Sequence, residues 1–372
     1  MLVGVPKEIK PDEYRVGLVP SAVRELILQG HQVIVQSGAG AGAGLTDVAY
    51  EAAGAQLVSS ADPIYSRAEL IVKVKEPLAA ERRKLRQEQV LFTYLHLAAD
   101  RGQAEDLLSS GCVAIAYETV TGSRGSLPLL MPMSEVAGRM APQVGARCLE
   151  KENGGRGILI GGVPGVPAAD VVILGGGTVG SNAALITLGM GADLTVVDRN
   201  PEALRRVATR FGTHVRTVFS TPDAVETLCR RADLIIATVL VPGAPAPKLI
   251  SAGTVKAMKP GAVIVDVSID QGGCAETSRP TTHSQPTFIV DDVVHYCVAN
   301  MPGAVARTST FALNNATLPF VLALAGKGYR RALADDPHLR AGLNVHQGRI
   351  TYEAVANALG FPYAPADRAL AT

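Results

Sequence analysis

The stretch Val171-Val172-Ile173-Leu174-Gly175-Gly176-Gly177-Thr178-Val179-Gly180 decides which fold this chain is expected to adopt. Its first four residues are apolar and mostly β-branched, which is typical of a buried strand. The glycines that follow have the spacing G-x-G-x-x-G, and a helical pattern begins at Val179. A second apolar run, residues 193–197, ends at Asp198, roughly 20 residues beyond the glycines, as the dinucleotide-binding fingerprint requires. The stretch therefore predicts a βαβ unit that binds a dinucleotide.

Each part of this unit has a physical role toward such a ligand. Gly175 permits a tight turn, Gly177 lets the backbone approach a pyrophosphate, and Gly180 lets the helix pack closely on the strand. The free N–H groups and the positive dipole end of the helix attract the pyrophosphate. Asp198 can accept hydrogen bonds from the adenosine ribose and would repel a 2′-phosphate, which favours NAD over NADP, although the neighbouring Arg199 weakens this preference. The alternative is a glycine-rich turn that binds no ligand.

A second glycine-rich stretch, Ser37 to Gly44, also follows an apolar run and precedes a helical pattern. Its glycines stand at every second position, and no strand that ends in Asp or Glu follows clearly. We expect it to be a structural turn, followed by a helix with Thr46 as its N-cap.

Apolar, β-branched runs alternate with amphipathic stretches along the rest of the chain, which is typical of α/β proteins with parallel sheets. The runs fall into two clusters, separated by the Gly- and Pro-rich residues 122–132 and 154–167. We therefore predict an α/β chain of two doubly wound, Rossmann-like domains with an active-site cleft between them. Strands are expected at residues 2–5, 32–35, 70–74, 90–95, 113–116, 169–174, 193–197, 234–237 and 262–268. Helices are expected at residues 21–29, 47–53, 179–188 and 201–211.

Two further helical patterns suggest how the domains are connected. Residues 134–150 read as a helix with Ser134 as N-cap, in which Pro142 predicts a kink or an irregular turn. Residues 308–325 read as a long helix with no strand after it. We expect these two helices to join the domains and the C-terminal segment to return to the first one. The expected domains are a discontinuous first domain, 1–130 plus 306–372, which the family resemblance described below implies to be the substrate domain, and an inserted NAD-binding domain, 131–305.

The composition argues against several classes of function. The 35 Lys and Arg nearly balance the 34 Asp and Glu among 372 residues, so no basic excess points to nucleic acid or to a membrane surface. No apolar run approaches the ~20 residues that a membrane span needs, and the N-terminus lacks the pattern of a signal peptide. The five cysteines are scattered without CxxC spacing, which argues against a disulfide framework or a cysteine-built zinc site. We expect a cytoplasmic protein without a metal.

Four polar residues follow or end apolar runs, where parallel sheets bind their ligands. Arg15 lies in the loop after the first expected strand, whereas Lys75, His96 and Asp270 each stand where a later run ends. Each has a structural alternative. Arg15 and Lys75 could be solvated strand ends, His96 could be a hydrogen-bonded core histidine, and Asp270 could cap the turn at residues 271–273. Spacing alone leaves these alternatives open.

These residues lie within long stretches that resemble the alanine dehydrogenases from one end of the chain to the other. Among the stretches are GVPKEIKPDEYRVGLVP, KVKEP, LFTYLHLAAD, LLMPMSEVAGRM, VVILGGGTVGSNAA, IVDVSIDQGGCAETSRPTTHSQP and VVHYCVANMPGAVARTSTFALNNATLP. The resemblance implies a homohexamer that uses NAD and interconverts L-alanine with pyruvate and ammonium. It also implies an active site between a substrate domain and a nucleotide domain.

The resemblance also implies roles for individual residues. Arg15 and Lys75 would bind the substrate carboxylate and carbonyl, His96 would donate and accept the proton, and Asp270 would be the second catalytic residue. Asn300 resembles the asparagine that approaches the substrate. The implied cofactor-binding residues are Ser134, Gly175, Gly177, Thr178, Val179, Gly180, Asp198, Ser220, Val239, Leu240, Val267, Ser268, Ile269, Asp270, Arg279, Val298 and Met301.

Two positions depart from the family pattern. Ala203 stands where relatives often carry a basic residue that contacts adenosine, a contact that Arg205 or Arg206 could supply, and Pro142 stands where we expect another residue.

Two other functions stay open at this point. One is the nucleotide-binding subunit of a proton-translocating transhydrogenase, and the other is a dehydrogenase that acts on glycine and glyoxylate or on saccharopine. A transhydrogenase subunit would have no use for Lys75, His96 and Asp270 together, which argues against the first of them.

Overall fold

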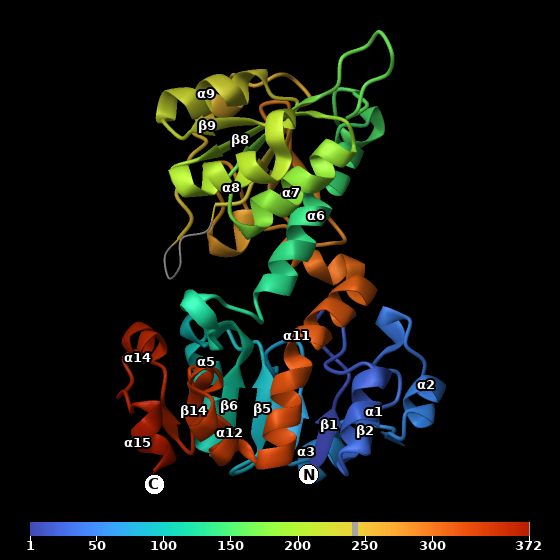
Figure 1. The fold of residues 1–372 in the computed structure, drawn as a ribbon, viewed down its shortest axis with the longest axis vertical. Helices are drawn as coiled ribbons and strands as arrows, with labels where there is room; N and C mark the ends of the chain where they lie inside the picture. The colour runs from blue at the N-terminus through green and yellow to red at the C-terminus, as the bar shows by residue number, and fades with distance from the viewer. Residues whose placement is uncertain (240–244, 372) are drawn as a thin grey trace. The chain divides into compact units, whose positions relative to one another are not determined.

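The computed structural model describes residues 1–239 and 245–371. The chain forms two compact units (Figure 1): unit 1 contains Met1–Met133 and Val305–Thr372, and unit 2 contains Ser134–Ala304. Each unit is built on a sheet whose strands run mainly parallel. The chain is thus an α/β protein with two doubly wound sheets, as the alternating sequence pattern predicts.

The sheet of unit 1 has the strand order β15-β14-β6-β5-β4-β1-β2-β3. The strands from β6 to β3 pair in parallel, whereas β14 and β15 pair antiparallel. Because the order places β6, β5, β4 and β1 next to one another, the loops that follow these four strands share one edge of the sheet. The bounds are β1 Leu2–Val5, β2 Gln32–Gln36, β3 Gln56–Val58, β4 Leu70–Val72, β5 Val90–Thr93, β6 Val113–Ala116, β14 Leu343–His346 and β15 Arg349–Ile350.

Two apolar cores cover the two faces of this sheet. One contains Phe92 and Ile115 together with α1 (Pro20–Leu28) and α11 (Ala306–Lys327), and the other contains Leu91 and Ala114 together with α3 (Asp62–Arg67), α5 (Arg101–Ser110) and α14 (Glu353–Leu359). Successive residues of a strand point to opposite faces, so a strand covered on both sides is apolar at every position. This explains the continuous apolar runs by which the central strands were predicted.

The C-terminal segment returns to this sheet. Helix α11 is followed by α12 (Tyr329–Asp335) and α13 (Pro337–Arg340), and then β14 pairs antiparallel with β6. The expectation that no strand follows the long helix is therefore wrong. Strand β14 is short and carries the buried polar residues Asn344 and His346, so it lacks the apolar run by which the other strands were found.

The sheet of unit 2 has the strand order β12-β13-β11-β10-β7-β8-β9, parallel except for β12, which pairs antiparallel with β13. Helix α7 (Thr178–Gly189) packs against β7 and β8, and α9 (Pro222–Arg231) packs against β7. The adjacent strands β11, β10, β7 and β8 bring the loops that follow them to one edge. The bounds are β7 Asp170–Leu174, β8 Asp193–Asp198, β9 Arg216–Phe219, β10 Leu234–Ala237, β11 Val263–Asp266, β12 Thr287–Val290 and β13 Val293–Tyr296.

Helix α6 (Met131–Cys148) begins earlier than the sequence predicts, so Ser134 lies in its first turn and is not the N-cap. Pro132 stands in that first turn, where its missing N–H leaves no helical hydrogen bond unmade. The helix also continues through Pro142, so no irregular turn interrupts it there. The other described helices are α2 Asp47–Ala52, α4 Ala79–Arg82, α8 Pro201–Phe211, α10 Ala252–Lys256 and α15 Ala366–Leu370.

The stretch from Ser37 to Gly44 forms turns and a short 3-10 helix, and the Thr46 hydroxyl accepts a hydrogen bond from the N–H of Ala49 as the N-cap of α2. Its interpretation as a structural turn is therefore confirmed. The Gly- and Pro-rich residues 154–167 contain neither a helix nor a strand, as expected.

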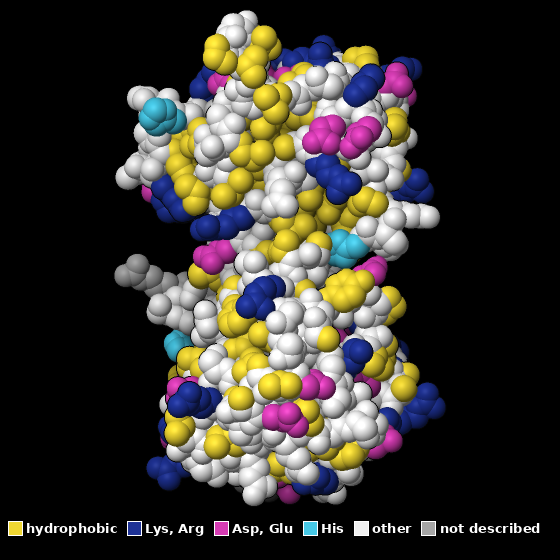
Figure 2. Space-filling view, turned by 90° about the vertical axis from the view of Figure 1, so that its right-hand side faces the viewer, with side chains coloured by type: hydrophobic (Ala, Val, Ile, Leu, Met, Phe, Trp, Pro, Cys, Tyr) yellow, Lys and Arg dark blue, Asp and Glu magenta, His cyan; other side chains and the backbone are white. Residues whose placement is uncertain are grey.

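Other features of the described chain concern its surface and its thiols. All five cysteines are buried and free. Lys, Arg, Asp and Glu side chains are interspersed on the face drawn in Figure 2, in keeping with the balanced charge of the sequence. No helix among the described residues is long and apolar enough to cross a membrane.

Candidate functional site

The loops after β1, β4 and β5 bring Arg15, Lys75 and His96 to one edge of the sheet in unit 1, because these strands are neighbours in the sheet. The loop after β1 crosses the end of β4 at Gly17, where a Cβ would overlap the backbone carbonyl of Val72. Glycine is therefore required for this close approach.

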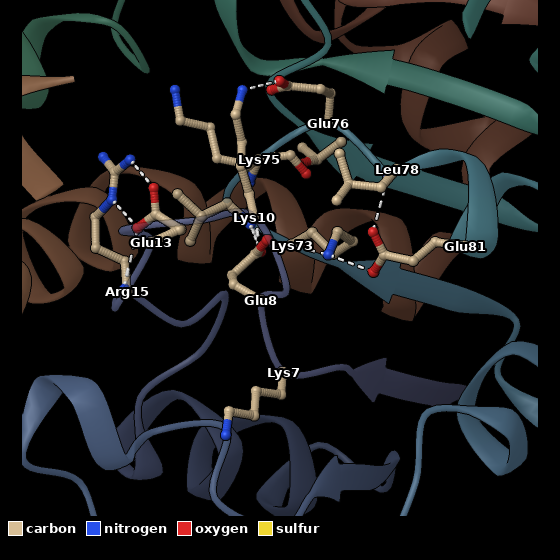
Figure 3. A network of polar contacts seen from close by, with 12 residues as sticks. Lys7, Glu8, Lys10, Glu13, Arg15, Lys73, Lys75, Glu76, Leu78 and Glu81 are labelled. Atoms are coloured by element: carbon tan, nitrogen blue, oxygen red, sulfur yellow. Dashed lines mark hydrogen bonds and ion pairs between the residues drawn. The ribbon is translucent and has the colours of Figure 1, made fainter. Parts of the chain in front are cut away.

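Arg15 is almost completely buried and is held by Glu13 (Figure 3). Its Nε donates to Oε1 of Glu13 at 2.6 Å and its Nη2 donates to Oε2 at 2.5 Å, while Nη1 lies 3.1 Å from Sδ of Met133. Burial alone lowers the pKa of Arg15, but the hydrogen bonds and the charge of Glu13 outweigh burial and raise it. The guanidinium thus keeps its charge in a buried place, where it can bind an anion strongly.

Lys75 lies beside this pair and is half-buried. Burial and the positive charge of Arg15 lower the pKa of Lys75, and Lys10 adds to this effect, while Glu76 and Glu13 oppose it. Lys10 and Glu76 form an ion pair next to it (Figure 3). Arg15, Lys75 and Lys10 thus lie close to the carboxylates of Glu13 and Glu76, and the charge of Glu8 also acts on Arg15.

A buried ionic network that the sequence did not predict supports the backbone at this edge. The Lys73 ammonium is fully buried and donates to Glu81 at 2.7 Å and to Glu8 at 3.1 Å (Figure 3). Glu8 in turn accepts a 2.7 Å hydrogen bond from the backbone N–H of Val74, next to Lys75. The only sequence signal was a lysine inside the apolar run 70–75, and its partners Glu81 and Glu8 lie 8 and 65 positions away along the chain.

His96 is exposed and does not lie in the core, which removes the interpretation of a buried core histidine. Its backbone has φ 49°, in the left-handed region that costs a residue with a side chain roughly 1 kcal/mol or more. Its ring stacks on Tyr94 with centroids 5.9 Å apart. Its backbone N–H donates to Oε1 of Glu118 at 2.6 Å. The imidazole is thus presented to solvent from a fixed turn.

In unit 2 the loops after β7, β8 and β10 enclose a cavity of about 330 Å³. It brings together eight of the predicted cofactor-binding residues: Ser134, Gly175, Gly177, Thr178, Val179, Asp198, Ser220 and Val239. It is also lined by residues for which the sequence gave no prediction as ligands: Leu174, Val197, Thr238, Pro247 and Leu249. Thr238 directly follows β10. Its position at the carboxyl end of a strand was the one sequence feature that could have indicated a place in the binding site.

The three glycines of the fingerprint have distinct environments. Gly175 has φ 104°, which a residue with a side chain rarely adopts. A Cβ on Gly177 would meet no atom within 4 Å, so the backbone there borders open space at the start of α7. Gly180 packs against the loop itself. The residues present therefore fit a pyrophosphate at the N-terminus of α7.

Asp198 ends β8 beside this loop. Its carboxylate accepts hydrogen bonds from the N–H of Gly176 at 2.6 Å and of Asn200 at 2.7 Å. Arg205, one of the two residues that could supply an adenosine contact in place of a side chain at Ala203, is instead paired with Glu202 on the exposed face of α8. Ala203 itself is buried.

Asp270 lies in the 3-10 segment Val267–Gln271 and is exposed. Among the described residues its carboxylate makes no hydrogen bond or ion pair, so it does not cap the following turn. Asp266, which is fully buried at the end of β11, is instead the N-cap of this 3-10 segment and also binds the chain after the turn. It accepts hydrogen bonds from Ser268 N at 3.1 Å, from Cys274 N at 2.7 Å and from Ser278 Oγ at 2.6 Å.

The remaining predicted cofactor residues do not line this cavity. Ser268 donates its hydroxyl to the carbonyl of Val239, Arg279 lies over the ring of Phe288, and Asn300 has φ 62° and pairs through its carbonyl oxygen with His283. Leu240 lies outside the described residues. Gly180, Val267, Ile269, Asp270, Val298 and Met301 are also absent from the lining.

Comparison with known proteins covers nearly the whole chain. The family model described as alanine dehydrogenase/PNT, N-terminal domain, matches residues 4–137, and the corresponding C-terminal domain matches residues 141–353. The alanine dehydrogenase of Halomonas elongata is 60% identical over 366 residues, which cover 98% of this chain and 99% of the relative.

Two solved structures extend the comparison. A structure titled L-alanine dehydrogenase matches with a TM-score of 0.95 and 53% identity over 97% of this chain and 99% of that one. A transhydrogenase from Sinorhizobium meliloti matches with a TM-score of 0.81 and 24% identity over 95% of this chain and 100% of that one, which is a likeness of fold.

Proposed function

The chain belongs to the alanine dehydrogenase/PNT family, and on this basis we propose that it is an NAD-dependent L-alanine dehydrogenase. The reaction converts L-alanine, NAD⁺ and water into pyruvate, ammonium, NADH and a proton, and it is reversible. The observation that carries the proposal is the 60% identity to a protein named alanine dehydrogenase across 98% of the chain.

Arg15 and Lys75 bind the substrate in this proposal. Arg15 binds the carboxylate, and Lys75 donates a hydrogen bond to the oxygen on which negative charge develops. Glu13 occupies the Nε and Nη2 edge of the guanidinium. This pair keeps the guanidinium charged and fixed in the position from which it would bind the carboxylate.

His96 and Asp270 handle protons and the amine. The exposed imidazole of His96 takes a proton from the attacking water and returns it in the reverse direction, since histidine is suited to acid–base work near neutral pH. The exposed carboxylate of Asp270 holds the ammonium group of alanine or the attacking water. Asn300 is the further residue proposed to contact the substrate.

The cofactor is proposed to be NAD, which supplies the hydride acceptor when it is bound. The N-terminus of α7 with Gly175 and Gly177 would hold the pyrophosphate, and Asp198 the adenosine ribose. The open space in front of Gly177 and the lining of the cavity support this assignment. The proposed further contacts are Val267, Ser268, Ile269, Asp270, Arg279, Val298 and Met301.

The wider organisation follows from the family resemblance. We propose a cytoplasmic homohexamer in which residues 1–130 plus 306–372 form the substrate domain and residues 131–305 the NAD-binding domain. Hydride transfer requires the two reacting carbons to be in contact. The proposal therefore includes a working state in which alanine bound by unit 1 reaches NAD bound by unit 2.

Absorbance at the NADH band tests the proposal. The purified protein is mixed with NAD and a panel of amino acids, and separately with NADH, ammonium and a panel of 2-oxo acids. Rapid NADH formation with L-alanine alone supports an alanine dehydrogenase. Hydride exchange between nucleotides without any reaction of L-alanine would instead identify a transhydrogenase component, and preference for glycine or saccharopine would identify a related dehydrogenase.

The role of His96 is tested separately. Replacement His96→Ala should abolish most of the oxidation of L-alanine. If the variant keeps activity within about threefold of the original protein, His96 is not the acid–base group.

A further inference from the structure

The turn that carries His96 is held in place by a carboxylate from the neighbouring strand connection. Oε1 of Glu118 accepts the backbone N–H of His96 at 2.6 Å and that of Leu95 at 3.1 Å, and Oε2 lies 3.2 Å from the same Leu95 nitrogen. Both N–H groups belong to the residues at which the chain leaves β5. One side chain therefore satisfies two consecutive donors that the sheet no longer pairs.

The topology brings this contact about. Strands β5 and β6 pair in parallel up to Thr93 and Ala116, so the chain segments that follow them run side by side. Glu118 lies in the 3-10 turn after β6, and Asn344 anchors this turn by donating to Thr119 Oγ1 at 2.7 Å. The carboxylate thus projects from a rigid support toward the turn of His96.

The backbone of His96 needs such support. With φ 49° it adopts a conformation that residues with a side chain avoid, while its neighbours Leu95 and Leu97 are buried. Gln103 holds the same turn by donating to the carbonyl of Leu95 at 2.7 Å. The strained backbone turns the imidazole outward while both neighbouring side chains stay in the core. Strained conformations of this kind persist only where the surroundings enforce them, and they cluster at active sites.

We propose that Glu118 is a positioning residue for His96, which fixes the imidazole for proton transfer through the backbone of its turn. The proposal rests on the proposed alanine dehydrogenase activity. Glu118 does not contact the substrate in this role, and its effect on the rate passes through His96. Catalysis is sensitive to such placement, since a shift of about 1 Å can lower a rate roughly 100-fold.

Four variants measure this role with L-alanine and NAD. Glu118→Ala should lower kcat about 10- to 100-fold while the KM values stay within about threefold, because Glu13 holds Arg15 and the hydroxyl of Thr93 donates to the backbone carbonyl of Lys75. Glu118→Gln keeps an oxygen at the Oε1 position and should retain most of kcat. Glu118→Asp keeps the charge but is one methylene shorter, and it should lose more activity than Glu118→Gln. Glu105→Ala removes a carboxylate on the exposed face of α5 that pairs only with Arg101 in the described ion pairs, and should change nothing.

A double-mutant cycle decides whether the effect passes through His96. If it does, His96→Ala and the double variant His96→Ala/Glu118→Ala have equal kcat. The proposal would be overturned if Glu118→Ala lowered kcat by the same factor in the His96→Ala variant as in the unaltered protein. It would also be overturned if Glu118→Asp were more active than Glu118→Gln. The comparison of Asp with Gln remains decisive even if Glu118→Ala does not fold.

Amide hydrogen exchange tests the contact without reference to activity. The N–H groups of Leu95 and His96 should exchange at least about tenfold faster in Glu118→Ala or Glu118→Asp than in the unaltered protein, with unchanged exchange in the core of β5. Unchanged protection of both amides would contradict the proposal. If the unaltered protein shows this protection but does not oxidise L-alanine, the proposed function fails and the contact itself stands.

Discussion

A Cβ placed on Gly180 would overlap the backbone carbonyl oxygen of Gly175. Gly175 begins the loop that follows β7, and Gly180 lies in the first turn of α7, so the loop can pack against this turn only because Gly180 carries no side chain. Gly177, between them, differs because a Cβ at that position would meet no atom within 4 Å. One motif thus contains a glycine required for packing and a glycine that leaves space for a ligand.

This difference predicts that two alanine substitutions affect different properties, one the stability of the protein and the other its binding of NADH. Gly180→Ala should lower the free energy of unfolding by about 1–3 kcal/mol, because the backbone has to move to admit the methyl group. Gly177→Ala should change stability by less than about 0.5 kcal/mol, yet weaken NADH binding at least about tenfold, since the methyl group occupies the space that the pyrophosphate needs. Urea unfolding and NADH fluorescence titration measure both. A Gly177→Ala variant that binds NADH normally would show that the pyrophosphate lies elsewhere.

Removal of Glu13 should damage both stability and substrate binding. Glu13→Ala leaves the buried Arg15 without its main carboxylate partner, which should cost about 3–5 kcal/mol, whereas Glu13→Gln keeps a neutral acceptor and should cost about 1–3 kcal/mol. The KM for pyruvate should rise in both variants because the guanidinium is no longer fixed. Unfolding by urea together with steady-state kinetics checks this. An unchanged stability of Glu13→Ala would mean that Arg15 does not depend on Glu13.

The charge of Asp198 should set the preference between the two nucleotides. Asp198→Ser should lower the ratio of kcat/KM for NAD to that for NADP about 10- to 100-fold, since a hydrogen bond to a charged group contributes about 1.5–3 kcal/mol and the repulsion of the 2′-phosphate disappears. Asp198→Asn removes the negative charge but keeps an oxygen that can accept from the N–H of Gly176. It therefore separates the loss of the 2′-phosphate repulsion from the loss of hydrogen bonding. Arg205→Ala is the control, since Arg205 is paired with Glu202. A ratio that Asp198→Ser leaves unchanged would contradict the ribose assignment.

The sequence predicted the central strands well and the edges poorly. The runs at β1, β6 and β10 were predicted with the observed bounds, because strands covered on both faces are apolar throughout. Strand β9 was missed because it is a largely exposed edge. Strands β12 and β13 were missed because the turn between them is Asp291-Asp292, with φ 46° and 59° and no glycine to indicate it.

Site residues that directly follow a strand could be predicted from the sequence, whereas side-chain contacts between different segments of the chain could not. Arg15, Lys75 and His96 were found because the carboxyl edge of a parallel sheet is a topological property. Glu118 and the Lys73 network depend on side-chain contacts between residues 8 to 66 positions apart, which one sequence does not encode as a local pattern. Ser134 was placed wrongly as an N-cap because Pro132 allowed α6 to start earlier.

The buried carboxylate of Asp266 should govern the segment that carries Asp270. Asp266→Asn replaces one acceptor oxygen by an N–H₂ group that faces the donors of Cys274 and Ser278, which should cost about 2–3 kcal/mol of stability. The value of kcat for L-alanine should fall because Asp270 loses its fixed position, while the NAD to NADP preference set by Asp198 should persist. A variant with normal kcat would show that the segment keeps its shape without Asp266.

The lowered pKa of Lys75 predicts how pyruvate binding depends on pH. Burial and the charge of Arg15 disfavour the ammonium form, so Lys75 loses its proton below the ordinary value of 10.5. Binding needs the protonated form, and the affinity for pyruvate should therefore fall as the pH rises through this lowered pKa. Calorimetry in the presence of NADH and without ammonium measures this fall in pyruvate affinity. Because pyruvate carries no group that titrates in the alkaline range, the fall reports on the protein.

Substitution of Lys10 should move the pH dependence of pyruvate affinity in one definite direction. Its positive charge lowers the pKa of Lys75, and its ion pair with Glu76 engages a carboxylate that otherwise stabilises the Lys75 ammonium. Lys10→Met removes the first effect and releases Glu76 for the second, so both changes raise the pKa of Lys75 and move the fall in pyruvate affinity to higher pH. Lys84→Met, which removes an exposed lysine paired with Asp62, should leave the profile in place. A profile that does not move in Lys10→Met, or that moves to lower pH, would mean that another group controls pyruvate binding.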